Sequence, residues 1–243
     1  MGLVALRRNS IAATVFDPTT LALSGWYRDA TVSPWSPTAS AGASGTNGTM
    51  TDATSPTAGA ALNGHNGSIY NGTTQKLGGA TAISSLASAA AWSLSVLVNP
   101  VASAVVHGAG ATYGDPCIVA DNTNGFGPLL AFTAAGFTVA HYDGASWKEQ
   151  SVANAGGAPA LVQCWYDGTN LNIQVNSVAA TNVVAGNLSG SGGAGLLRLG
   201  SNYLAAAWCP CTIYDVMMSN TDLGATARGN IKSYVNSRYS LSL

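Results

Sequence analysis

Six Asn-Gly or Asp-Gly dipeptides after residue 61 constrain the fold of this chain more than any other feature. They recur at short intervals between runs rich in Val, Ile, Phe, Tyr and Trp. Asn or Asp followed by Gly accepts the positive φ angles of two-residue hairpin turns, so this spacing favours antiparallel strands over crossover helices. The architecture expected is all-β. The dipeptides begin at Asn63, Asn66, Asn71, Asn124, Asp143 and Asp167.

Two stretches show the period-2 alternation of a strand with one face against a core. Residues 161–181 read as three short strands joined by two tight turns, with Leu171, Ile173 and Val175 on the buried face. Residues 134–152 follow the same scheme around the Asp143-Gly144 turn. There the alternation places Phe137, Val139 and His141 on one face and Thr138, Ala140 and Tyr142 on the other.

The two ends of the chain differ from this pattern. Residues 1–60 contain a mixed apolar and basic start and then a stretch of Ser, Thr, Pro, Gly and Ala that lacks the apolar side chains for a core of its own. We therefore expect an extended N-terminal arm over 1–60, lying on this protein or on a neighbour, and a sandwich domain over 61–243. Near the C-terminus a short helix is expected, with Ser219 or Thr221 as N-cap. Its apolar stripe comprises Leu223, Ala227, Ile231, Tyr234 and Val235.

Composition excludes several classes of partner. Charged residues make up 8% of the chain, against roughly 25% in an ordinary soluble domain, and the net charge is −1. Such a chain offers no electrostatic attraction for phosphate, so no nucleic-acid partner is expected. The most apolar window, 86–106, is interrupted by Asn99-Pro100 and by serines, and it predicts core strands and no membrane partner. No signal peptide is expected in the first ten residues, and the four cysteines are expected to be buried free thiols.

Four further segments, in order, resemble the laminin G-like, concanavalin A-like domain family. They are "AWSLSVLVNP", "LVQCWYDGTNLNIQVNSVAAT", "LRLGSNY" and "CTIYDVMMSNTDLGATARGNIKSYVNSRY". The order matches a family pattern in which a Tyr-Asp-Gly hairpin precedes a strand ending in Leu-Gly and then a strand that leads into a short helix. With "LNGHNGSIYNGTTQKL" as the opening strand, the resemblance covers residues 61–243.

The resemblance implies a jelly-roll sandwich of two antiparallel sheets, the concave one often used to bind sugars. The front piece, "FDPTTLALSGWYRDATVSPW" and the linker after it, is similar to versions found in structural proteins of tailed-bacteriophage virions. This likeness implies a non-enzymatic virion protein, such as a capsid decoration or head-fibre component, assembled in the host cytoplasm. Its partners would be other virion proteins or further copies of itself.

Catalytic chemistry has little support in the sequence. Glycosidases need two carboxyl groups about 5 Å apart, or roughly 6.5 to 9.5 Å apart. The chain has a single Glu, Glu149, and its nine Asp lie mostly at expected turns, such as Asp143 and Asp167, or near the start of the expected helix. The candidate bases His65, His107 and His141 have no recognisable nucleophile beside them. "DNTNG", from Asp121, lacks the closing Glu of a calcium loop. We expect no enzyme activity, no metal and no cofactor.

The candidate functional residues are therefore contact residues. An exposed aromatic side chain beside Asn or Asp is a typical sugar contact, and the Asp143-Gly144 turn is flanked by aromatics. The carbohydrate-binding candidates are Trp147, Tyr142 and Asp143. They support an alternative function, a lectin-like module of a tail or receptor-binding protein that binds host surface glycans. The candidates for an interface with other proteins are Arg7, Arg8, Trp26 and Trp35, although anchoring of the front piece is the simpler role for the two tryptophans.

Overall fold

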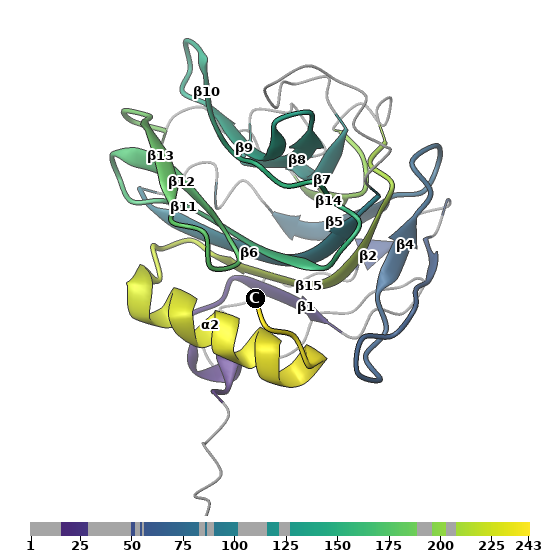
Figure 1. Cartoon of the computed structure of the whole chain (residues 1–243). Helices are drawn as coiled ribbons and strands as arrows, with labels where there is room; N and C mark the ends of the chain where they lie inside the picture. The colour runs from purple at the N-terminus through teal and green to yellow at the C-terminus, as the bar shows by residue number, and fades with distance from the viewer. Residues whose placement is uncertain are drawn as a thin grey trace, which may run out of the picture.

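The fold consists of two antiparallel sheets packed face to face, with one long helix outside them (Figure 1). It is seen in a computed structural model that describes residues 16–28, 50, 51, 54, 56–82, 86, 90–101, 116–121, 127–188, 196–202 and 208–243. The prediction of an all-β jelly-roll sandwich with a C-terminal helix is confirmed.

Both sheets combine hairpin neighbours with neighbours that are far apart in sequence, as in a jelly roll. The order of the eight-stranded sheet is β13-β12-β11-β6-β15-β4-β3, and β1 also pairs with β15. Its strands are β1 (Gly25–Arg28), β3 (Thr57–Ala58), β4 (Ser68–Tyr70), β6 (Trp92–Pro100), β11 (Ala160–Tyr166), β12 (Asn170–Val175), β13 (Thr181–Val184) and β15 (Cys211–Ser219).

The order of the seven-stranded sheet is β10-β9-β8-β7-β14-β5-β2. Its strands are β2 (Met50–Thr51), β5 (Leu77–Ala82), β7 (Cys117–Asp121), β8 (Leu129–Thr133), β9 (Gly136–Tyr142), β10 (Trp147–Val152) and β14 (Leu196–Leu199). The inner faces of both sheets supply the main core, which includes Trp92, Phe132, Phe137 and Tyr166.

The predicted meander over 161–181 is confirmed as β11, β12 and β13. Asp167 closes the first turn, where its Oδ1 accepts hydrogen bonds from the backbone N–H groups of Thr169 and Asn170. Gly168 follows it at φ +96°, a conformation that favours glycine. The predicted apolar face of β12 is buried in the core. The opposite face of β11 and β12 lies under the helix and forms part of a site described below.

The front piece belongs to the sandwich. β1 pairs in register with β15, so that Trp26 lies opposite Met217. The Trp26 side chain is fully buried, its Nε1–H donates to Asp215 Oδ1 over 2.8 Å, and its ring meets Tyr234 edge to face. The prediction that Trp26 contacts another protein is therefore wrong, because no part of it reaches the surface. Arg7, Arg8 and Trp35 lie outside the described residues.

Strands from before residue 60, the expected boundary between arm and sandwich, take part in the sheets. β1 and β3 precede that residue, and both form part of the eight-stranded sheet. Residues 16–28 and 56–60 are thus integrated with the sandwich. The other residues of the expected arm are outside the described ranges, apart from β2 and Thr54.

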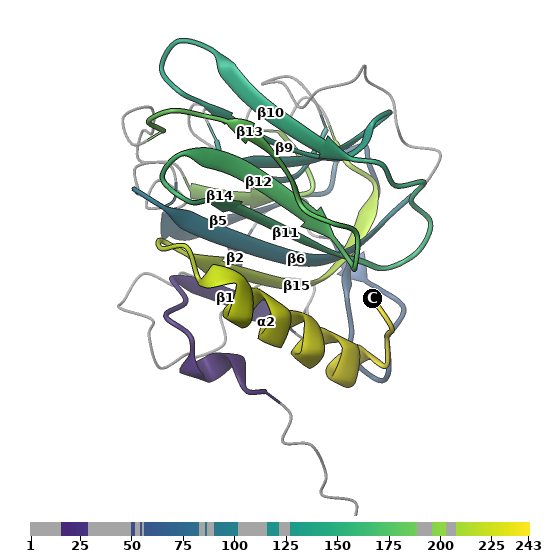
Figure 2. The same cartoon turned by 60° about the vertical axis from the view of Figure 1, so that its left-hand side comes forward.

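The helix α2 (Gly224–Tyr239) lies along the outer side of the eight-stranded sheet (Figure 2). Its predicted apolar stripe is confirmed at Ile231, Tyr234 and Val235, which are buried against the sheet. The predicted N-cap is wrong, because α2 begins after Leu223, which has no capping side chain. The Ser219 hydroxyl instead accepts from the Thr221 N–H within the preceding turn.

The four cysteines have the state that the sequence predicts. Cys117, Cys164, Cys209 and Cys211 are all buried and none is in a disulfide, which confirms the prediction of free thiols. Burial raises the pKa of the Cys164 thiol well above its usual range. Among the tryptophans, Trp92 and Trp165 are buried, whereas Trp208 is partly exposed.

The turn between β8 and β9 yields a prediction on stability. Gly136 has φ +104°, and a Cβ there would overlap with the backbone around the Val152 carbonyl. Gly144 has a similar φ of +95°, but nothing lies within 4 Å of its Cβ position. Gly144→Ala should therefore cost only the backbone strain, about 1–2 kcal/mol. Gly136→Ala should cost at least about 2 kcal/mol more, because backbone atoms must move. Urea denaturation of both variants measures the difference, and equal losses would contradict the described turn.

Candidate functional site

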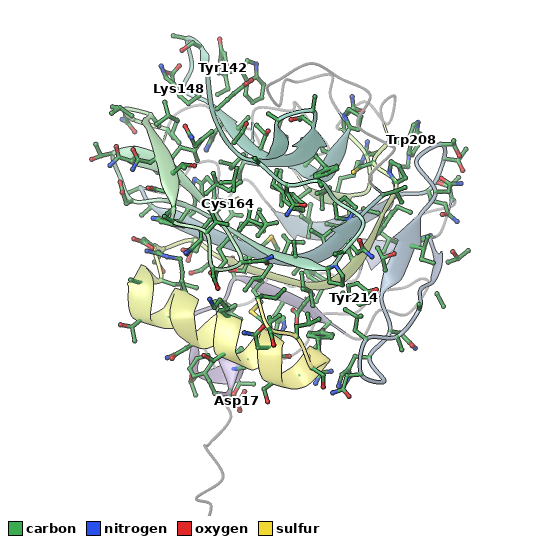
Figure 3. The ribbon with its side chains drawn as sticks, in the orientation of Figure 1. Asp17, Tyr142, Lys148, Cys164, Trp208 and Tyr214 are labelled. Carbon is green, nitrogen blue, oxygen red and sulfur yellow. The ribbon has the colours of Figure 1, made fainter. Side chains whose placement is uncertain are left out.

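The three carbohydrate-binding candidates lie together at one end of the β9–β10 hairpin. Tyr142 ends β9, Trp147 begins β10, and the two residues are direct cross-strand partners. Their rings meet edge to face with centroids 5.7 Å apart, and both side chains are partly exposed. Figure 3 shows Tyr142 and Lys148 at this end of the hairpin, far from α2. We call Tyr142, Asp143, Trp147 and Lys148 the aromatic tip.

Asp143 holds the turn of the aromatic tip. Its Oδ1 accepts from the backbone N–H groups of Ala145 and Ser146, and its Oδ2 lies 3.1 Å from Lys148 Nζ. These backbone hydrogen bonds lower the pKa of Asp143 to about 2, with a smaller contribution from Lys148. The carboxylate is therefore ionised at neutral pH and largely occupied within the turn. The partly exposed faces of the two aromatic rings are the surface that the tip offers to a ligand.

Polar side chains follow the aromatic pair along the same face of the hairpin. Because alternate residues of a strand share a face, Trp147, Glu149 and Ser151 lie on one side of β10. The Ser151 hydroxyl is 2.8 Å from that of Thr138, which is in turn 3.1 Å from that of Thr133. Sequence reasoning missed this strip, although the alternation of β9 and β10 was the signal for it.

A second site lies between α2 and the outer face of β11 and β12. It is a cavity of about 370 Å³, which we call the helix–sheet pocket. Residues of both strands, of the loop before β13 and of α2 line it. The lining residues are Gln163, Trp165, Gln174, Ala180, Ala225, Arg228, Gly229 and Lys232. None of them was a candidate from the sequence.

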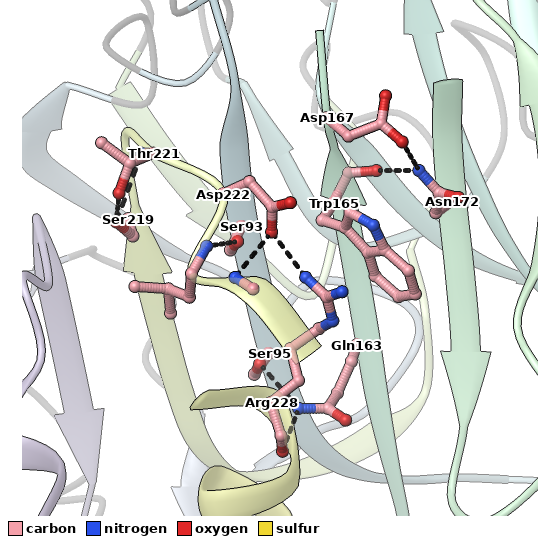
Figure 4. Close-up of polar contacts among 12 residues, drawn as sticks. Ser93, Ser95, Gln163, Trp165, Asp167, Asn172, Ser219, Thr221, Asp222 and Arg228 are labelled. Atoms are coloured by element: carbon pink, nitrogen blue, oxygen red, sulfur yellow. Dashed lines mark hydrogen bonds and ion pairs between the residues drawn. The ribbon is translucent and has the colours of Figure 1, made fainter. Parts of the chain in front are cut away.

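Contacts between strand and helix side chains build this pocket (Figure 4). The guanidinium of Arg228 lies 3.8 Å from the centre of the Trp165 ring, a cation–π contact. Arg228 Nη1 also donates to Asp222 Oδ1. Gln163 Nε2 donates to the Arg228 carbonyl over 3.1 Å, which ties β11 to the helix. Arg228 is therefore held from two sides.

The two histidines in the described part of the chain differ in burial. His141 is fully buried, as its predicted face requires, and no described residue is a hydrogen-bond partner for either of its ring nitrogens. Burial lowers the pKa of His141 to about 3, so the imidazole is neutral at pH 7. His65 is partly buried and contacts the Tyr239 ring edge to face. His107 lies outside the described residues.

The described residues contain neither a cluster of metal-ligating side chains nor a membrane-spanning helix. No group of three or more His, Cys, Asp or Glu side chains there is arranged to hold a metal ion. Among the described helices, none has the length and apolar character required to cross a bilayer.

Comparisons with known proteins show the fold and no family. No protein-family model matches the chain, and no curated protein matches it. Solved structures do match. The binding domain of Paraclostridial Mosquitocidal Protein 1 is 10% identical, with a TM-score of 0.63 over 88% of this chain and 52% of that one. The botulinum neurotoxin serotype G binding domain is 11% identical, with a TM-score of 0.61 over 86% of this chain and 50% of that one.

A sialidase from Trypanosoma rangeli is similar over 98% of this chain and 35% of its own, with 14% identity and a TM-score of 0.53. The chain thus spans about half the length of the toxin binding domains and about a third of the sialidase. All three contain a lectin-like β-sandwich, in agreement with the jelly-roll part of the resemblance. At such low identity the likeness establishes the fold alone.

Proposed function

We propose that this chain is a non-enzymatic glycan-binding module that binds saccharides at the aromatic tip. The observation that carries the proposal is the partly exposed Tyr142–Trp147 pair at the end of a hairpin. Such rings offer an apolar face to the C–H groups of a sugar, while the partly exposed Glu149 and Ser151 beside them offer partners for its hydroxyls. Because the chain has few charges, binding should depend little on salt.

The structural comparisons support this function more than a virion role. The similar structures include binding domains of toxins. Another similar structure, 9% identical with a TM-score of 0.59, is described by the dependence of botulinum neurotoxin type C cell entry on two ganglioside molecules. The same fold thus occurs in proteins that engage glycans. A location in a virion, with other virion proteins as partners, stays a prediction from the front piece. A lectin-like module at the tip of a virion would have both functions.

Four acidic residues in the described part of the chain have structural roles, which supports binding without catalysis. Asp143 and Asp167 each accept backbone hydrogen bonds within a turn. Asp222 forms an ion pair with Arg228. Asp215 is buried and accepts hydrogen bonds from Trp26 and Tyr239. Carboxyl groups engaged in this way are poorly placed to act as the acid and base of a glycosidase.

Trp147→Ala tests the proposal. On a glycan array, the wild-type chain should bind at least one saccharide class saturably, and Trp147→Ala should weaken that binding at least tenfold, which is about 1.4 kcal/mol. Trp147→Phe retains a ring and should keep most of the affinity. Val184→Ala, at a residue that is 67% exposed on another strand, is the matched control for nonspecific effects. Unaltered glycan binding in Trp147→Ala would show that the aromatic tip is not the binding site.

A further inference from the structure

The helix–sheet pocket has the properties of a second, separate binding site. It lies on the outer face of the eight-stranded sheet, whereas the aromatic tip belongs to the β9–β10 hairpin at one edge of the other sheet. Its volume of about 370 Å³ is at the small end of the range of ligand pockets, about 300–1,000 Å³. We infer that this pocket binds an acidic monosaccharide, with the carboxylate at Lys232 and Arg228 and the hydroxyls at Gln163 and Gln174.

The charge of the lining carries the first part of this inference. Lys232 and Arg228 are the charged residues that line the pocket, and no carboxylate is among its lining residues. Asp222 pairs with Arg228 and compensates one of the two positive charges. Lys232 Nζ donates to the neutral Ser177 hydroxyl over 2.8 Å, so its charge is not neutralised there. The lining therefore keeps a net positive charge, which favours an anion.

The two glutamines carry the second part. Gln163 and Gln174 are cross-strand partners and lie side by side on the pocket wall. The nitrogen of each amide already donates to a backbone carbonyl, that of Arg228 for Gln163 and that of Val178 for Gln174. These bonds fix the amide planes and leave the oxygens as acceptors for hydroxyl groups. Two neutral acceptors beside a positive charge match a ligand that carries both hydroxyls and a carboxylate.

Arg228 is held in place before any ligand arrives. Trp165 supports its guanidinium on one side and Asp222 holds Nη1. A side chain fixed in this way loses little conformational entropy on binding. Because guanidinium groups match the planar geometry of carboxylates, the remaining donors of Arg228 suit this ligand. A simple inorganic anion would engage the two cations and leave the glutamines unused.

Ligand titrations followed by NMR test the inference, with glucuronate, glucose and inorganic phosphate as the probes. Glucuronate should cause saturable shifts at the amides of α2 near Gly229. Glucose, which lacks the carboxylate, and phosphate, which lacks the hydroxyls, should each bind at least tenfold more weakly. Lys232→Gln should weaken glucuronate binding about tenfold or more, and Lys232→Arg should restore it.

Gly229 offers a steric test that leaves the charges in place. It lines the pocket in the middle of α2, and nothing lies within 4 Å of its Cβ position. Gly229→Leu should place a side chain at the pocket and abolish glucuronate binding. Gly229→Ala, the matched control, should bind as the wild type does.

The inference fails if glucuronate gives no saturable shift, or if glucose or phosphate binds as tightly. It also fails if Gly229→Leu binds glucuronate normally. Trp147→Ala separates the two sites, because it should lower glycan binding at the aromatic tip and leave these shifts unchanged. Glucuronate binding at the helix–sheet pocket can therefore be tested separately from glycan binding at the aromatic tip.

Discussion

The free energy of unfolding of the wild-type protein should change little between pH 4.5 and 6.5. In Asp215→Asn it should instead fall steeply as the pH is lowered over this interval. Burial raises the pKa of Asp215 to about 7, against hydrogen bonds from Trp26 and Tyr239 and the charges of Arg238 and Arg28. Its stabilising effect is complete below the unfolded pKa of about 3.9 and is lost as the pH rises to about 7. This carboxyl group alone would make the protein more stable in acid.

His141 acts in the opposite direction over the same interval. Its pKa falls from about 6.5 in the unfolded chain to about 3 in the fold, because burial disfavours the charged imidazole. Its contribution is present above pH 6.5 and is lost as the pH falls, at about 1.4 kcal/mol per pH unit. Between pH 4.5 and 6.5, one proton is bound at Asp215 in the folded state and one at His141 in the unfolded state. The two effects cancel in the wild type.

Urea denaturation at pH 4.5, 5.5 and 6.5 measures these contributions. Asp215→Asn should lose about 2–3 kcal/mol of unfolding free energy from pH 6.5 to 4.5. His141→Gln should instead gain a similar amount over that interval, whatever its overall stability. Comparing slopes with pH avoids the constant cost of each substitution. Parallel slopes in the wild type and both variants would show that neither group is buried as described.

Trp26→Ala should be among the most destabilising single substitutions in this chain, with a loss of about 3–5 kcal/mol. It removes a fully buried indole from beneath α2 and takes away the donor that serves Asp215. Trp26→Phe retains a ring, so its loss should be smaller and reflect mainly the missing hydrogen bond. Denaturation at pH 5.5 gives both values, with Val184→Ala expected within about 0.5 kcal/mol of the wild type. A loss below about 1 kcal/mol for Trp26→Ala would mean that the front piece does not anchor to the sandwich.

Local signals explain which parts of this fold the sequence could predict. Asp167-Gly168 and Asp143-Gly144 specify hairpin turns through a few neighbouring atoms, so the two meanders followed from short windows of sequence. The buried stripe of α2 likewise followed from helical spacing. The role of Trp26 could not be predicted in this way, because its partner Asp215 is 189 residues away. Nothing near Trp26 in the chain indicates whether it faces β15 or a different molecule.

The two candidate sites also differ in how far apart their residues lie in the sequence. The aromatic tip was predictable because Tyr142 and Trp147 flank one turn, and hairpin pairing brings them together. The helix–sheet pocket requires knowledge of where α2 docks, because Gln163 and Arg228 are separated by 65 positions. The start of α2 was misplaced for a related reason. Ser219 is a good N-cap residue, but it is the last residue of β15, and the sheet extends the strand through it.

Reversible binding without turnover is the central claim for this protein, and one mixture tests it directly. A glycan that the array identifies is incubated with the purified chain, and saturation-transfer NMR follows the bound sugar while mass spectrometry follows its integrity. The account predicts transfer to the sugar that disappears in Trp147→Ala, with the glycan recovered intact after prolonged incubation. Cleavage of the glycan by the wild-type chain, or transfer that persists in Trp147→Ala, would contradict it.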